Sequence, residues 1–268
     1  TAPVFTPGDN FNTVLYTGDG TSSNAITGVG FEPNLTWIKN RSSSSNNHAL
    51  FDSVRGIQRE LRSDTTDAEI DYTATNYSLK SFDIDGFTVG DVTAGNYNVN
   101  GAVGGTYSGN AEFVAWSWKA GGAARNNTDG SVASLVSANT AAGFSIVSTQ
   151  SDGSGYLNFG HGLSQAPELV ITKFTSQTGQ WYTYTSAISN GFDVALKLNS
   201  ADAAITAYGA NKWSSTDSVV GVGNPQWYFT ANVPFITYCF HSVAGYSKIG
   251  SYTGNGSTTG PIVTLGFE

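Results

Sequence analysis

One short segment sets the expected architecture: residues 113–119, which read FVAWSWK. Aromatic and β-branched residues are enriched in β-strands, so this run predicts a strand. A similar run, FITYCFH, occupies residues 235–241, 122 positions further along the chain. We therefore expect two equivalent strands, each closing one copy of a repeated unit.

The two units also begin alike. Residues 11–20 (FNTVLYTGDG) lead to VGFEPNLTWIK at 29–39, and residues 143–148 (GFSIVS) lead to APELVITK at 166–173. The loops differ in length between the copies while the framework is kept, as is usual for duplicated units. We predict an extended lead-in at 1–10, a first β-sandwich at 11–119, a linker of turns at 120–131 and a second β-sandwich at 132–245.

A third opening follows at residues 246–268. Its YTGNG at 252–256 matches YTGDG at 16–20, and its LGFE at 265–268 matches VGFE at 29–32. Two interpretations stay open. The segment begins a third repeat beyond Glu268, or it forms a terminal hairpin that completes the second unit or a neighbouring subunit.

The composition favours an all-β protein. Aromatic residues make up 13% of the chain and charged residues only 12%, and there are 32 Gly. Aromatic, β-branched and turn-forming residues are typical of β-sheets, and no apolar run approaches the about 20 residues of a membrane helix. The net charge of −8 argues against nucleic acid and anionic membranes as partners. We expect two tandem β-sandwich domains of a jelly-roll, lectin-like type.

Local patterns predict the individual elements. Strands are expected at 34–39, 113–119, 168–174, 180–185 and 235–241. Polar residues within 35–38 and 113–116 suggest strands with one buried face. One segment, 52–62, has apolar residues at helical spacing, so one or two helical turns are expected there.

Charged residues are segregated in the first unit. Residues 64–91 hold seven acids, whereas five of the 12 basic residues lie at Lys39, Arg41, Arg55, Arg59 and Arg62. These groups could pair within a unit, pair between subunits, or stay solvated on loops.

Three segments together resemble a repeat module of tailed bacteriophages, especially marine ones: residues 30–39, 50–56 and 113–122. Modules of this kind occur in fibres, appendages and capsid decorations, and they look like laminin-G or concanavalin-type β-sandwiches. The resemblance extends over about residues 11–268. It implies a structural or adhesive protein on the virion surface, outside the cell, which forms a homo-oligomer, contacts other virion subunits and could touch a host glycan.

The sequence offers little to catalysis, so no enzyme, no catalytic residue and no cofactor are expected. It has no Gly-x-Ser-x-Gly elbow and no phosphate-binding loop, and its three His (48, 161 and 241) have no recognisable nucleophile partner. Cys239 lies in an apolar run, which favours a buried core residue over a catalytic or intermolecular thiol. A polysaccharide depolymerase is the least favoured alternative.

Two residue groups are candidates for ligand binding. Asp83 and Asp85, at i and i+2 of one expected strand, fit a plain turn, a weak Ca²⁺ site completed by Asp91, or an acid pair. Aromatic rings stack on sugars, and four in the second unit are candidates for this role: Trp181, Trp213, Trp227 and Tyr228. For Trp213 and Trp227 a place in the core is the favoured alternative. A lectin-like glycan-binding module is therefore the main alternative function. Trp37, Trp116 and Trp118 are assigned to cores or to the contact between units.

Overall fold

A computed structural model confirms the all-β class. It describes residues 6–75, 77–90, 98–101, 111–154, 156–188, 194–206, 213–223 and 231–267. Within these ranges, helix is limited to a 3₁₀ turn at Pro7–Asp9, and all other regular structure is strand. The same ranges contain no helix of the length and apolarity needed to cross a membrane.

The first half of the molecule, residues 11–118, contains two antiparallel sheets and one short strand pair. The larger sheet has the order β1 (Phe11–Thr17), β9 (Glu112–Trp118), β3 (Leu35–Asn40), β4 (Ala49–Asp52). The smaller sheet has the order β2 (Asn24–Thr27), β8 (Gly86–Gly90), β7 (Ser78–Asp83). The short pair is β5 (Arg59–Glu60) with β6 (Ile70–Asp71).

The second half, residues 125–240, also has one large and one small sheet. The large sheet has the order β10 (Arg125–Asn127), β11 (Ser134–Asn139), β12 (Phe144–Asp152), β20 (Ala231–Phe240), β14 (Leu169–Phe174), β15 (Tyr182–Thr185), β16 (Val194–Lys197), β17 (Ile205–Thr206). The small sheet has the order β13 (Tyr156–Gly160), β19 (Val219–Gly223), β18 (Ser214–Ser215).

The two halves share one strand order. The order β1-β9-β3-β4 recurs as β12-β20-β14-β15, and the order β2-β8-β7 recurs as β13-β19-β18. The registers correspond as well: Trp118 lies opposite Phe11 and Leu35. Phe240 lies opposite Phe144 and Leu169 in the same way. The second half differs by extending its large sheet with β10 and β11 at one edge and with β16 and β17 at the other.

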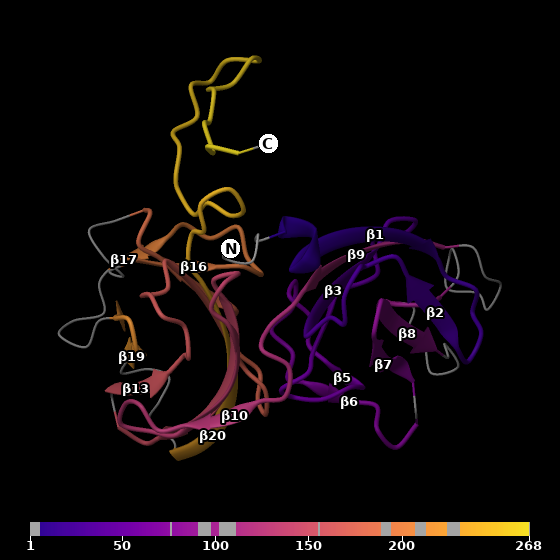
Figure 1. Cartoon of the computed structure of the whole chain (residues 1–268), viewed down its shortest axis with the longest axis horizontal. Coiled ribbons are helices and arrows are strands. Elements are labelled where there is room, and N and C mark those ends of the chain that lie inside the picture. Colours follow the sequence, from indigo (N-terminus) through magenta and orange to yellow (C-terminus); the bar gives the residue numbers. More distant parts are fainter. Residues whose placement is uncertain are drawn as a thin grey trace, which may run out of the picture.

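Three apolar clusters hold the sheets together. The first-half core and the second-half core each fill the space between a large sheet and its small sheet. A third cluster, here called the seam, draws its residues from both halves: Leu35, Leu50, Leu61, Ala120, Phe144, Ile146, Trp181, Ile236 and Tyr238. Figure 1 shows the resulting layers side by side, from β13 and β19 at the left to β2, β7 and β8 at the right.

The seam explains why the central strands are apolar on both faces. In β3, Leu35 belongs to the seam whereas Ile38 belongs to the first-half core. The expectation that residues 35–38 bury a single face is therefore wrong, because the second face is covered by the other half. Trp118 lies at the expected contact between halves, with its ring 6.4 Å from that of Phe144 and 6.5 Å from that of Phe240.

Three local expectations are corrected. Residues 52–62 form no helix, because Gly56 and Gln58 adopt positive φ angles of 102° and 63°, which a right-handed helix does not allow. The lead-in is not fully extended, since Pro7–Asp9 forms the 3₁₀ turn. The linker contains a strand, β10, and not turns alone.

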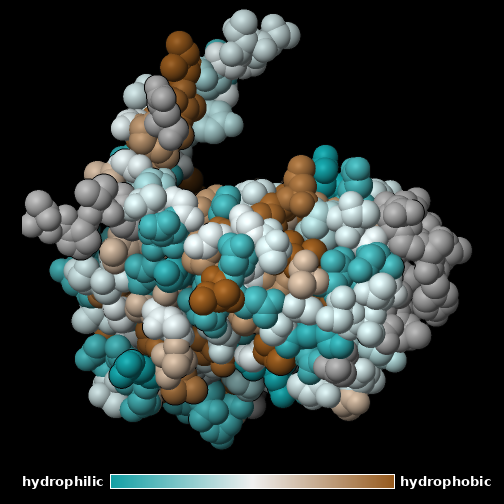
Figure 2. Space-filling view, turned by 45° about the vertical axis from the view of Figure 1, so that its right-hand side comes forward, coloured by the Kyte–Doolittle hydropathy of each residue, from teal (hydrophilic) through white to brown (hydrophobic). Residues whose placement is uncertain are grey.

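The C-terminal residues 248–267, here called the arm, form no strand, although all of them are described. The expected terminal hairpin is therefore not formed within this chain. The preceding residues close with a single bridge between Val243 and Ser247. The arm then rises away from the body (Figure 1), and Figure 2 shows strongly apolar atoms on it, clear of the rest of the surface.

Candidate functional site

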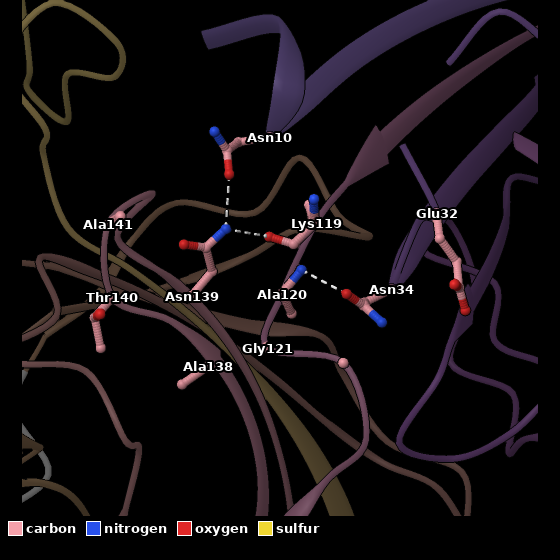
Figure 3. Close-up of a pocket in the computed structure, with 11 residues that line it drawn as sticks. Asn10, Glu32, Asn34, Lys119, Ala120, Gly121, Ala138, Asn139, Thr140 and Ala141 are labelled. Atoms are coloured by element: carbon pink, nitrogen blue, oxygen red, sulfur yellow. Dashed lines mark hydrogen bonds between the residues drawn. The ribbon is translucent and has the colours of Figure 1, made fainter. Parts of the chain in front are cut away.

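A groove of about 580 Å³ lies where the linker between the halves passes the end of β11. Its walls come from both halves, and the polar side chains in them are Asn10, Glu32, Asn34, Lys119, Asn139 and Thr140. Figure 3 shows the three Asn side chains grouped around Lys119 and the first linker residue, Ala120.

Amide side chains hold the groove in shape. Asn34 Oδ1 accepts a hydrogen bond from the Ala120 N–H (2.8 Å), and Asn34 Nδ2 donates to Ser53 Oγ (3.2 Å). Asn139 Nδ2 donates to Asn10 Oδ1 (2.8 Å) and to the Lys119 carbonyl (3.1 Å), as drawn in Figure 3. Because each bond joins segments far apart in the sequence, the groove is largely formed before any ligand arrives.

The groove has a polar lining with two charged residues. Glu32 and Lys119 are its charged lining residues, and both are exposed. Glycoside hydrolysis usually needs two carboxyl groups facing each other, and this lining provides one. Gly121 lies so close to Ala138 that a Cβ would clash with the Ala138 carbonyl, so glycine is needed at this wall.

A buried ion pair lies at the seam, and no sequence pattern predicts it there. Arg55 Nε is 2.6 Å from Asp52 Oδ2, Arg55 Nη1 is 2.9 Å from Glu69 Oε2, and the Arg55 and Asp52 side chains are only 4% and 0% exposed. Tyr238, from β20 of the other half, donates its hydroxyl to the same Asp52 oxygen (2.8 Å). One buried carboxylate thus accepts bonds from both halves.

Electrostatics fixes the protonation of this cluster. Burial alone would lower the pKa of the Arg55 guanidinium, but the charges of Asp52 and Glu69 outweigh it and raise this pKa above its ordinary value. Burial, reinforced by Asp52, raises the pKa of Tyr238 well above its ordinary value. The cluster therefore keeps Arg55 charged and Tyr238 protonated at neutral pH, so the contacts of both residues with Asp52 persist.

The segregated charges pair within the first half. Arg59 contacts Glu69 (3.0 Å) and Asp71 (3.1 Å), and Arg62 contacts Glu60 (2.9 Å). Of the alternatives left open by the sequence, pairing within one unit is what these residues adopt. Only a three-dimensional signal could have shown that Arg55, among the five bases, is the buried one.

The aspartates expected as weak Ca²⁺ ligands have structural partners. Asp85 lies in the turn between β7 and β8, so it shares no strand face with Asp83, and that expectation is wrong. The Asp85 carboxylate accepts the N–H groups of Gly28 (3.0 Å) and Gly30 (2.6 Å), which lowers its pKa. Asp83 accepts the Thr88 hydroxyl (2.7 Å). Asp91 lies outside the described residues, which contain no group of three His, Cys, Asp or Glu placed to hold a metal ion.

Two of the four aromatic candidates for a sugar platform lie in the core, which is the favoured alternative for Trp213. Trp181 is fully buried in the seam, and Trp213 is 4% exposed and stacks on Tyr184 with ring centroids 3.4 Å apart. A ring packed in this way has no free face for a sugar. Trp227 and Tyr228 lie outside the described residues, so their role stays a prediction.

His48, His161 and Cys239 are each part of the packed structure. His48 Nδ1 accepts the Trp37 indole N–H (2.8 Å), and His161 Nε2 lies 3.0 Å from the Thr216 carbonyl; burial lowers the pKa of both rings. Burial raises the pKa of the Cys239 thiol to about 12. Cys239 is thus a buried core residue and is not a thiolate at neutral pH.

Comparison with known proteins places the chain in one family. No curated protein matches it, and no solved structure matches it. Residues 6–268 match the profile of a family described as Domain of unknown function (DUF7483), a match that includes both halves and the arm. The chain therefore belongs to the DUF7483 family.

Proposed function

We propose that this protein is a structural and adhesive component of a bacteriophage virion surface: a fibre, appendage or capsid decoration that acts without catalysis and forms an oligomer. The resemblance of residues 30–39, 50–56 and 113–122 to phage modules supports a place on the virion. The observation that carries the mechanical role is the seam, because it joins the two halves into one body.

The contacts across the seam are unusually strong for neighbouring repeats. Interfaces between domains of one chain are commonly polar and permit relative motion. Here an apolar cluster and the Arg55 ion pairs are buried between the halves. Backbone bonds add to them: the Glu69 N–H donates to the Thr175 carbonyl (2.8 Å), and the Gly179 N–H donates to the Thr66 carbonyl (2.8 Å). A rigid body of this kind suits a component that transmits load or presents a surface.

Immunogold electron microscopy tests this role directly. Affinity-purified antibodies against the 268-residue chain are used on particles of a phage whose genome encodes it. We expect regular gold labelling at one position on intact virions. Absence of label on purified particles, with the protein found only in the soluble lysate, would contradict the proposal.

A second candidate function, glycan binding, is favoured by the amide-lined groove. Amide and carboxylate groups around a preformed groove match the hydroxyl groups of a sugar. Binding would be measured by glycan array and then calorimetric titration of each hit. Glu32→Gln should weaken such binding, whereas Glu112→Gln, a matched change at an exposed residue outside the groove lining, should leave it unchanged. Saturable binding without virion labelling would favour this second function over the first.

A further inference from the structure

Two equivalent strands differ in what covers their outer edge. β12 is paired on one side with β20 and on the other with β11. β1 occupies the same position in the first half and is paired with β9. Among the described residues, no strand pairs with the opposite edge of β1.

The uncovered edge of β1 also carries apolar side chains. Leu15 is 65% exposed, and Val14 is only partly covered where it packs against the first-half core. A free edge offers unpaired N–H and C=O groups to any extended segment, and natural proteins usually cover or charge such an edge. The second half covers the equivalent edge with β11, whereas the described residues of the first half provide no strand in that place.

The arm has the properties of that missing strand. Ile262, Val263 and Leu265 are 97%, 49% and 48% exposed, which is unusual for three apolar residues so close together. Residues 262–266 read IVTLG, and residues 135–139 of β11 read LVSAN. Both segments have two aliphatic residues, a small hydroxyl residue, a further apolar residue and a turn-forming residue in the same order.

We propose that residues 262–266 of one copy add as an antiparallel strand to the free edge of β1 in a second copy, in the place that β11 takes beside β12. This inference rests on the proposed oligomeric function and specifies its contact. Strand addition of this type gains affinity from backbone hydrogen bonds and specificity from alternate side chains.

The register follows from aligning residues 262–266 with residues 135–139 of β11. β11 pairs Leu135 with Ser148 and Val136 with Val147. Since Phe144 is equivalent to Phe11, the same pairing in the first half places Ile262 opposite Leu15 and Val263 opposite Val14. Residues directly opposite in an antiparallel pair share a face. Val263 would then cover the exposed side of the first-half core, and Ile262 would cover Leu15.

A second copy is the occupant that the chain itself suggests. Every copy carries one arm and one β1 edge that no described strand covers, so the contact is head-to-tail and generates a ring or an open filament. The arm of this chain hydrogen-bonds to its own second half, from Ser251 Oγ to the Ala187 carbonyl (2.6 Å), and leaves Ile262 almost fully exposed. The apolar residues of the arm are therefore available to another chain.

Mixed cysteine cross-linking tests the pairing. The full chain is prepared as two separate variants, Leu15→Cys and Ile262→Cys, which are mixed and oxidised mildly. We expect a covalent dimer of twice 28.1 kDa from the mixture but from neither variant alone. Buried Cys239 is the only other cysteine and should not react. Replacing Ile262→Cys by Ser257→Cys, in an exposed part of the arm outside the pairing segment, should greatly reduce the product.

Light scattering supplies the second readout. The parent chain should show a mass of two or more times 28.1 kDa, and Ile262→Asp should return it to the monomer mass. Ser257→Asp adds the same charge and should leave the assembly intact. A monomeric parent, or an assembly that Ile262→Asp leaves unchanged and no mixed cross-link, would overturn the pairing. Virion labelling is measured independently, so loss of the pairing and loss of the virion role are distinguishable.

Discussion

The two halves of this protein repeat one strand order but contribute different chemistry to the contact between them. The first half supplies the buried ion pair of Arg55 and Asp52. The second half supplies aromatic groups, with Tyr238 bonded to Asp52 and Trp181 bonded through its indole N–H to the Arg62 carbonyl (2.7 Å). The two halves repeat in sequence but are not structurally independent, because each half completes the burial of the other.

The largest effect is expected from removing the charge that the first half contributes. Arg55→Met leaves Asp52 buried without its cation, and breaking a buried pair in this way costs about 3–5 kcal/mol. Urea denaturation should show this loss in the free energy of unfolding. Arg41→Met is the matched control: its partner Glu112 lies 3.7 Å away and both side chains are about half exposed, so its loss should cost about 0–1 kcal/mol. Equal losses of unfolding free energy in the two variants would mean that the buried ion pair stabilises the fold no more than the exposed one does.

A smaller effect is expected from the aromatic side of the seam. Trp181→Phe keeps an aromatic ring but removes the hydrogen bond to the Arg62 carbonyl, which is then left with the longer bond from the Thr65 N–H (3.4 Å). The expected cost of losing this bond is about 0.5–1.5 kcal/mol in the same denaturation experiment. An unchanged free energy of unfolding would show that the bond from Trp181 to the Arg62 carbonyl does not stabilise the seam.

Lys173 gives the effect that depends most on pH. It is 1% exposed, and its Nζ donates to the Phe174 carbonyl (2.9 Å) and to the Thr66 carbonyl of the first half (3.4 Å). Burial lowers its pKa from 10.5 to about 8. Between these two pH values the unfolded chain binds more protons than the folded chain, so this residue makes the folded state more stable as pH rises.

The variant Lys173→Met isolates that contribution. Other groups titrate in the same range, so the informative quantity is the difference in free energy of unfolding between parent and variant. We expect this difference to shift in favour of the parent as pH rises from about 8 toward 10.5. A difference that stays constant over this range would contradict the assigned pKa direction.

The framework of the fold could be predicted from the sequence, whereas the contact between its halves could not. Residues 113–119 and 235–241 form β9 and β20 because dense aromatic and β-branched residues favour strands wherever they lie. The spacing of apolar residues in 52–62 suggested a helix, but Leu61 instead packs in the seam. Burial against a distant segment leaves no periodic signal that separates these outcomes.

The candidate site was predictable only in part, for a related reason. The sequence offers Trp181 and Trp213 as candidates for stacking on sugars, but their exposure depends on what packs over them. The groove depends on Asn10, Asn34 and Asn139, three residues that are unremarkable in the sequence and meet only in the folded chain. No local motif could have grouped them.

Differential scanning calorimetry of a monomeric chain tests most directly whether the two halves form a single body. The variant Ile262→Asp, which should be monomeric, avoids any contribution from assembly. The account predicts one transition whose van't Hoff enthalpy equals its calorimetric enthalpy, with Arg55→Met lowering the temperature of that transition as a whole. Two separate transitions, only one of them shifted by Arg55→Met, would contradict it.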